Sequence, residues 1–265
     1  MRFFEQVRQC FQEKNIDIKV MLIHQLAKRT RENGDIDVQT FGTVLDVNDN
    51  GRPSKPELVK ATGVPKRGFG IVEGRAIMMH AIAHIEFNAM NLALDAVQRF
   101  PDMPEAYYRD WLQVADEEAY HFELIRAHLR FLGADYGDYP AHNGLWDMVE
   151  KTAHNVLHRM ALVPRVLEAR GLDVTPGIQK KLRQSGDEHA ATLLNIIFTD
   201  EIGHVQVGTR WFRYLCEREH KKADDTFLAL LAEYFPKGLH GPYNMDAREA
   251  AGFSNRELQM LLGEV

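Results

Sequence analysis

The chain has 265 residues, of which 45% are hydrophobic and 26% charged, with a formal net charge of −6 at pH 7. These values are typical of a globular protein that buries a sizeable core. Lysine and arginine are dispersed without a long basic run, so there is no strong nucleic-acid signal. No stretch reaches the roughly 18 apolar residues of a membrane span, and the start does not resemble a signal peptide. The widely separated Cys10 and Cys216 suit a reducing compartment, so we expect a cytoplasmic protein without a membrane partner.

Periodicity and turn residues predict an all-α protein. Residues 1–30 carry the pattern of two short helices, whereas 31–70 hold Asn-Gly and several prolines and should be mostly irregular. The remaining predicted helices cover residues 73–100, 104–132, about 145–171, 175–184, 187–219, 227–234 and 255–262, and the third of them could begin later than residue 145. Residues 133–144 then form a long crossover between two helical hairpins. We therefore expect N-terminal helices with an irregular extension (1–70), a four-helix bundle (71–220) and C-terminal accessory helices (221–265).

One pattern occurs twice along the predicted bundle. Glu86 precedes Glu118-Ala-Tyr-His121 by 32 residues, and Glu168 precedes Glu201-Ile-Gly-His204 by 33 residues. Two successive helical hairpins would each supply half of a shared site in this way. Four glutamates and two histidines from four helices are the ligands of carboxylate-bridged dinuclear centres in helix bundles. The mixture suits iron best, with manganese or a mixed Mn/Fe pair as alternatives.

The surroundings of these residues favour metal ligands over surface pairs. Glu118 and His121 share a helical face with Trp111 and Ile125, and Glu201 and His204 fall in an equally apolar stripe. No comparable set of arginines occupies these stripes, so two cations would be the simplest compensation for four buried carboxylates. A buried network of hydrogen-bonded carboxylates is the alternative. A third match, Glu217-Arg-Glu-His220, has no apolar stripe and is interpreted as a charged helix end.

Several neighbours of the ligands have possible supporting roles. Glu117 and Asp200 directly precede a ligand, and we expect each to accept the free ring N–H of a histidine ligand across the bundle; plain surface acidity is the alternative. His84 is a further candidate outer partner because it lies two residues from Glu86. Pro164 should kink the third helix four residues before Glu168, which either aims that ligand or is a tolerated core kink.

The chain also resembles a known family. Its matching stretches are residues 74–76, 80–86, 116–122, 136–142, 159–177 and 200–205. From about residue 51 to 261 they are similar to an uncharacterised bacterial ferritin-like family known as a domain of unknown function. The resemblance implies a ferritin-like fold and supports the six ligands, but it brings no established substrate. More distantly, the ligand pattern is similar to that of tRNA-modifying hydroxylases and other di-iron oxygenases.

Three classes of function follow from a dinuclear centre. The first is an oxidase, oxygenase or hydroxylase that uses O2, an unknown small-molecule or nucleoside substrate and an electron-donor protein. The second is an iron-handling protein, a ferroxidase or store, and the third is a structural metal-binding protein. The extra segments 31–70 and 220–265 favour the enzyme because they could frame a substrate pocket. The sequence leaves oligomerisation open.

Overall fold

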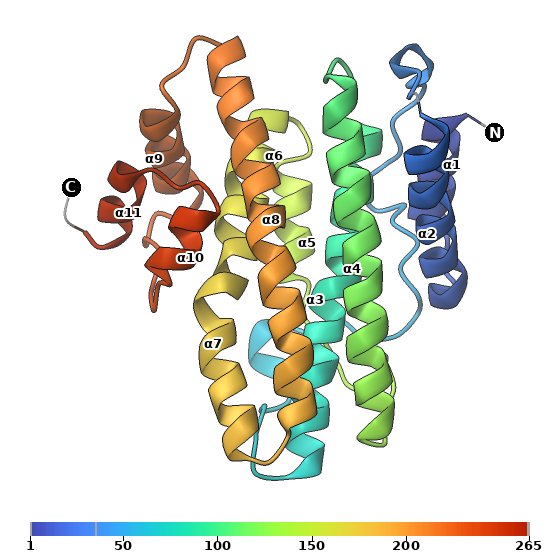
Figure 1. Cartoon of the computed structure of the whole chain (residues 1–265), viewed down its shortest axis with the longest axis vertical. Helices are drawn as coiled ribbons and strands as arrows, with labels where there is room; N and C mark the ends of the chain where they lie inside the picture. The colour runs from blue at the N-terminus through green and yellow to red at the C-terminus, as the bar shows by residue number, and fades with distance from the viewer. Residues whose placement is uncertain (1, 35, 264–265) are drawn as a thin grey trace. The chain divides into compact units, whose positions relative to one another are not determined.

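The computed structural model describes residues 2–34 and 36–263, and this part of the chain is helical with irregular connections (Figure 1). Within it, the sole pairing of extended backbone is an isolated bridge between Leu58 and Ala141. The prediction of an all-α protein is therefore confirmed. The chain divides into two compact units, residues 1–150 and 151–265.

The N-terminal unit is built on a long helical hairpin. Its helices are α1 (Phe3–Gln12), α2 (Ile16–Asn33), α3 (Val72–Arg99), α4 (Glu105–Phe131) and α5 (Gly144–Lys151), the last of which ends at the unit boundary. The helices α3 and α4 pack along each other, while α1 contacts α3 and α2 contacts α4 (Figure 1). The two long helices lie within one residue of their predicted bounds. The predicted pair of N-terminal helices is confirmed as well.

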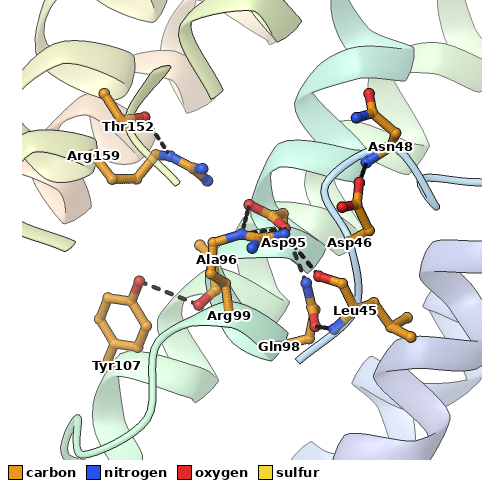
Figure 2. A network of polar contacts seen from close by, with 10 residues as sticks. All are labelled: Leu45, Asp46, Asn48, Asp95, Ala96, Gln98, Arg99, Tyr107, Thr152 and Arg159. Carbon is orange, nitrogen blue, oxygen red and sulfur yellow. Dashed lines mark hydrogen bonds and ion pairs between the residues drawn. The ribbon is translucent and has the colours of Figure 1, made fainter. Parts of the chain in front are cut away.

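The irregular segment before α3 is fastened to the end of that helix by polar contacts (Figure 2). The helical elements of this segment in the described part of the chain are two 3-10 turns, η1 (Val38–Thr40) and η2 (Ala61–Gly63). Asp95 accepts hydrogen bonds from Arg99 (2.7 Å) and from Gln98 (3.0 Å). Gln98 in turn accepts from the Leu45 N–H (2.9 Å), and Arg99 donates to the Leu45 carbonyl (3.1 Å). These bonds satisfy backbone groups that lack a secondary-structure partner.

The C-terminal unit contains a second hairpin and three short helices. Its elements are α6 (Val156–Leu162), a π-helical segment η3 (Val163–Glu168), α7 (Ala169–Gln184), α8 (Glu188–Arg218), α9 (Ala223–Tyr234), α10 (Met245–Ala250) and α11 (Asn255–Leu261). The helices α7 and α8 pack against each other, and α10 contacts both (Figure 1). Asp187 caps α8 by accepting a hydrogen bond from the Ala190 N–H (3.1 Å), as its position before the helix predicts.

The third predicted helix, from about residue 145 or later to residue 171, is interrupted near its start, and the prediction that it ends at Gly171 is wrong. The chain breaks after α5, and Asn155 starts the new helix α6 by accepting from the Leu157 and His158 N–H groups (2.8 and 3.2 Å). At the other end, α7 continues through Gly171 and Pro176 to Gln184. Gly171 stays helical instead of taking the positive φ of a C-terminal cap, and the helix tolerates the hydrogen bond that Pro176 removes.

Candidate metal centre

The N-terminal unit brings three of the predicted ligands together. Helix α3 carries Glu86, while α4 carries Glu118 and His121 on one face because residues three apart are neighbours on a helix. The ligand atoms of the three side chains all lie within 4.8 Å of one another. His121 Nδ1 is 3.6 Å from Glu86 Oε2 and 3.5 Å from Glu118 Oε2. One ring nitrogen thus faces two carboxylates from two helices.

These two separations fit ligands around an ion better than direct hydrogen bonds. Hydrogen bonds between a ring nitrogen and a carboxylate oxygen are about 2.7–3.2 Å long. Nitrogen and oxygen ligands bind transition metals at about 2.0–2.2 Å, so two neighbouring ligand atoms are about 3.0–3.6 Å apart. The arrangement of Glu86, Glu118 and His121 can therefore accommodate a cation.

The same three side chains are almost completely withdrawn from solvent. Glu86 is 3% exposed, and Glu118 and His121 are 0% exposed. Burial and the adjacent Glu118 raise the pKa of Glu86, although His121 opposes the shift. Burial lowers the pKa of His121, but the two carboxylates outweigh it and raise the pKa well above its ordinary value. Metal ligands have to be deprotonated, so a metal bound here would displace any protons on these three side chains.

The C-terminal unit repeats part of this arrangement. His204 Nδ1 lies 3.7 Å from Glu201 Oε2 on α8, and the two residues are 1% and 8% exposed. The nitrogen that faces the carboxylate is Nδ1 in both units. Glu168 is also buried, at 7% exposed, and it is the last residue of η3. Among the described residues, Glu168 does not join a group of three ligand atoms as close as those of the N-terminal unit.

The backbone that carries Glu168 departs from α-helical geometry. Pro164 lies in η3, and the Ala169 N–H bonds to the Pro164 carbonyl five residues back, as in a π-helix. Gly208 on α8 lies against the proline ring, since a Cβ at Gly208 would be 2.3 Å from Pro164 Cγ. A π-helical segment contains one residue more than the α-helix it replaces, so it turns the following residues by about 100°. The departure expected at Pro164 is therefore a π-helical segment packed against a glycine.

The C-terminal unit buries three arginines, although no comparable set of arginines was expected in the stripes that carry the ligands. Arg159 and Arg165 are 0% exposed and Arg248 is 2% exposed. Arg165 pairs with Glu257 (2.6 Å) and Arg248 with Asp173 (2.8 Å). A signal was available in the sequence, because Arg165 interrupts the apolar run of residues 160–167. An arginine inside such a run needs a buried partner.

The three candidate outer partners differ in what the structure assigns to them. His84 Nδ1 lies 2.9 Å from the Tyr136 hydroxyl, and its Nε2 accepts from Asn88 (3.1 Å), which leaves no ring nitrogen for Glu86. Burial lowers the pKa of His84 to about 4, so the ring is neutral. Glu117 accepts a hydrogen bond from Gln113 (2.7 Å) and is half-buried, as is Asp200. The hydrogen bonds that Glu117 and Asp200 are expected to accept from the histidine ligands stay predictions.

A small pocket lies in the N-terminal unit between α3 and the irregular segments. Pro65 and Arg67 from the segment before α3 form part of its wall, opposite His80 and His84 of the helix itself. His84 is two residues from Glu86 and hence about 200° away around the helix. This pocket therefore opens on the face of α3 opposite Glu86.

The third Glu-x-x-His match has none of these properties. Glu217 and His220 are both exposed, and α8 already ends at Arg218. His220 adopts a positive φ of 55°, which is outside helical geometry. The interpretation as a charged helix end is confirmed.

Fold and site together define an all-helical protein with groups of acidic and histidine side chains that could hold a metal ion. None of the described helices combines the length and the apolar character that crossing a bilayer demands. The chain belongs to the family described as "Protein of unknown function (DUF455)", whose model matches residues 12–259. It is 50% identical to an uncharacterized protein of Haemophilus influenzae over 216 residues, which cover 79% of this chain and 75% of the relative. No solved structure matches the chain significantly.

Proposed function

We propose that this protein is a ferritin-like four-helix-bundle protein that binds two metal ions. Each unit supplies half of the ligands, which are Glu86, Glu118 and His121 from the first and Glu168, Glu201 and His204 from the second. Iron is the metal that we expect first, with manganese or a mixed Mn/Fe pair as alternatives.

The arrangement around His121 is the observation that supports the proposal most. Three titratable side chains occupy a solvent-free cluster, with one ring nitrogen 3.5–3.6 Å from two carboxylate oxygens. A buried carboxylate is costly unless a cation compensates it. Four glutamates carry four negative charges and two divalent ions carry four positive charges, so the complete ligand set would be neutral. The histidines remain neutral as ligands.

We favour an O2-dependent oxidoreductase within this class. When bound, a pair of iron ions would supply redox electrons for the reduction of O2. The chain's own residues would orient the ions and exclude water from them, since apolar side chains such as Met79, Met90 and Leu194 are buried. The substrate would be a small molecule or a nucleoside, and an electron-donor protein would restore the reduced state.

Metal binding by single variants tests the ligand assignment. Purified wild-type protein should bind two ions per chain, measured by elemental analysis after loading with Fe(II) under anaerobic conditions. Glu118→Ala and His204→Ala should each bind fewer than two, whereas the exposed decoy variants Glu217→Ala and His220→Ala should bind as many as the wild type. Equal losses in ligand and decoy variants would contradict the assignment.

A comparison between the units tests whether the centre is shared. Glu118→Ala changes the N-terminal unit and Glu201→Ala the C-terminal unit. If both units hold one centre, either variant should weaken both ions. If each unit bound its own ion, either variant would remove one ion and leave the affinity for the other unchanged.

Reaction with O2 separates the three functional classes. Protein loaded anaerobically with Fe(II) should oxidise about two Fe(II) per chain on exposure to O2 and then stop, and it should remain a small oligomer by light scattering. Oxidation of many tens of Fe(II) per chain by a large shell would favour storage. A reduced centre that is inert to O2 would favour a structural metal.

A further inference from the structure

Arg165 has an unusual environment in the C-terminal unit. Its side chain is completely buried, with Nη2 2.6 Å from Glu257 Oε1 and Nε 3.3 Å from the Thr209 hydroxyl. Three aromatic rings surround the guanidinium, at 4.1 Å from Phe227, 4.6 Å from Phe212 and 4.7 Å from Phe253. Among the described residues, Nη1 has no hydrogen-bond partner, so the three aromatic rings form an apolar cage around a guanidinium that is only partly hydrogen-bonded. Planar guanidinium groups suit such a site because they stack on aromatic rings while their N–H groups donate hydrogen bonds in fixed directions.

The partners of Arg165 come from the helices that follow the second hairpin. Glu257 belongs to α11 and Phe227 to α9, and Phe253 lies between α10 and α11. Arg165 itself lies in η3, three residues before Glu168. The guanidinium thus ties the turn that presents a proposed metal ligand to the C-terminal accessory helices.

The energetics argue against stability as the sole role of this ion pair. Burying two charges costs free energy that their attraction barely repays, and apolar residues of the same volume often stabilise a protein as well or better. An apolar side chain cannot fix a direction, whereas the guanidinium is oriented by its bonds to Glu257 and Thr209. A π-helical turn gives up the regular α-helical hydrogen bonds, so external contacts have to define its conformation.

We propose that Arg165 is a positioning residue: the C-terminal helices, acting through its guanidinium, hold η3 in the conformation that presents Glu168 to the metal ions. This inference rests on the proposed function, because Glu168 is a ligand only there. The C-terminal helices α9 and α11 then have a role in the site, because their contacts with Arg165 fix the turn that carries Glu168. The carboxylate of Glu168 then needs no hydrogen bond from Arg165 itself.

The same unit offers a matched control. Arg248 on α10 is 2% exposed and binds both carboxylate oxygens of Asp173 on α7, at 2.9 and 2.8 Å. It also stacks near Phe253, at 5.1 Å. Like the pair of Arg165 and Glu257, this pair is buried and contacts an aromatic ring, but it ties α10 to α7 beyond η3. Loss of Arg248 should therefore lower stability without moving Glu168.

The test uses the full chain stripped of metal and titrated anaerobically with Co(II), followed by its visible absorption. Arg165→Met should bind one of the two ions at least 10-fold more weakly than the wild type. Arg248→Met should keep both affinities. Glu257→Gln preserves the shape of the pair and serves if Arg165→Met does not fold; it should weaken the same ion. In metal-free protein, the amides of residues 165–169 should exchange hydrogen faster in Arg165→Met than in Arg248→Met.

The outcomes separate this inference from the proposed function. Weakened Co(II) binding confined to the Arg165 and Glu257 variants, with faster exchange in η3, supports the positioning role. If the wild type binds two ions and the Arg165 variant matches it, or if Arg248→Met weakens binding equally, the inference fails while the metal centre stands. If the wild type does not bind two ions, the proposed function fails and the inference with it.

Discussion

Gly208→Ala should displace the turn that carries Glu168. The added Cβ would lie 2.3 Å from Pro164 Cγ and 2.4 Å from Pro164 Cβ. Carbon atoms pack at about 3.5–4.0 Å, so α8 and η3 have to separate locally by about 1 Å or more. The proline ring cannot rotate away as a flexible side chain would. The substitution therefore moves Glu168 relative to Glu201 and His204, which lie on α8.

The expected magnitudes follow from this overlap. Overpacking a well-filled core costs about 1–3 kcal/mol, and the better helix propensity of alanine returns up to about 1 kcal/mol. We expect a net loss of about 1–2 kcal/mol, or about 2–8 °C in melting temperature for a chain of this size. Metal ligands tolerate errors of only about 0.2 Å, so the ion bound by Glu168 should bind at least 10-fold more weakly.

Gly203→Ala provides the control for this prediction. Gly203 lies on the same helix, next to His204, and a Cβ there would meet nothing within 4 Å. The variant should be as stable as the wild type or up to about 1 kcal/mol more stable, with unchanged metal affinity. Calorimetry and anaerobic Co(II) titration of both variants check the pair. A Gly208→Ala protein with wild-type stability and metal binding would refute the role assigned to the contact with Pro164.

Three further predictions concern other parts of the chain. Lys19→Met should cost about 2–4 kcal/mol in urea unfolding, because the buried ammonium donates three bonds, including one of 2.6 Å to Asn91; an unchanged midpoint would contradict this. The hydrogen bond to Asp116 raises the pKa of His24, so its contribution is present below about pH 6.5 and is lost as the pH rises through the folded pKa. His24→Gln should therefore destabilise the protein at pH 5.5, by less than about 1 kcal/mol for a ring that is 35% exposed, and hardly at pH 8.5; an equal effect at both pH values would refute the pairing. Asp200→Asn should keep the fold and weaken metal binding about 10-fold or more, and unaltered Co(II) titration curves would remove Asp200 from the centre.

The sequence by itself determined the long helices and the first half of the candidate site. The bounds of α3, α4 and α8 agree with the predictions to within one residue, because Pro101, Gly133 and Asp187 act locally on helix ends. The cluster of Glu118 and His121 follows from the helical repeat, which places residues three apart on one face. Glu86 also joins the cluster, as the pairing of α3 with α4 requires.

Only the tertiary structure decided the conformation around Glu168. Pro164 locally disfavours a regular α-helix because it lacks a backbone N–H, but this does not by itself specify a π-helical segment; the contact with Gly208, 44 residues away, accompanies that choice. Arg165 is likewise buried because Glu257, 92 residues further on, provides its counter-charge. Such pairings depend on how distant segments pack, whereas helix ends and faces depend on neighbours within a few residues. Local physics therefore predicts the helices, and long-range packing sets the geometry of the turn that presents Glu168.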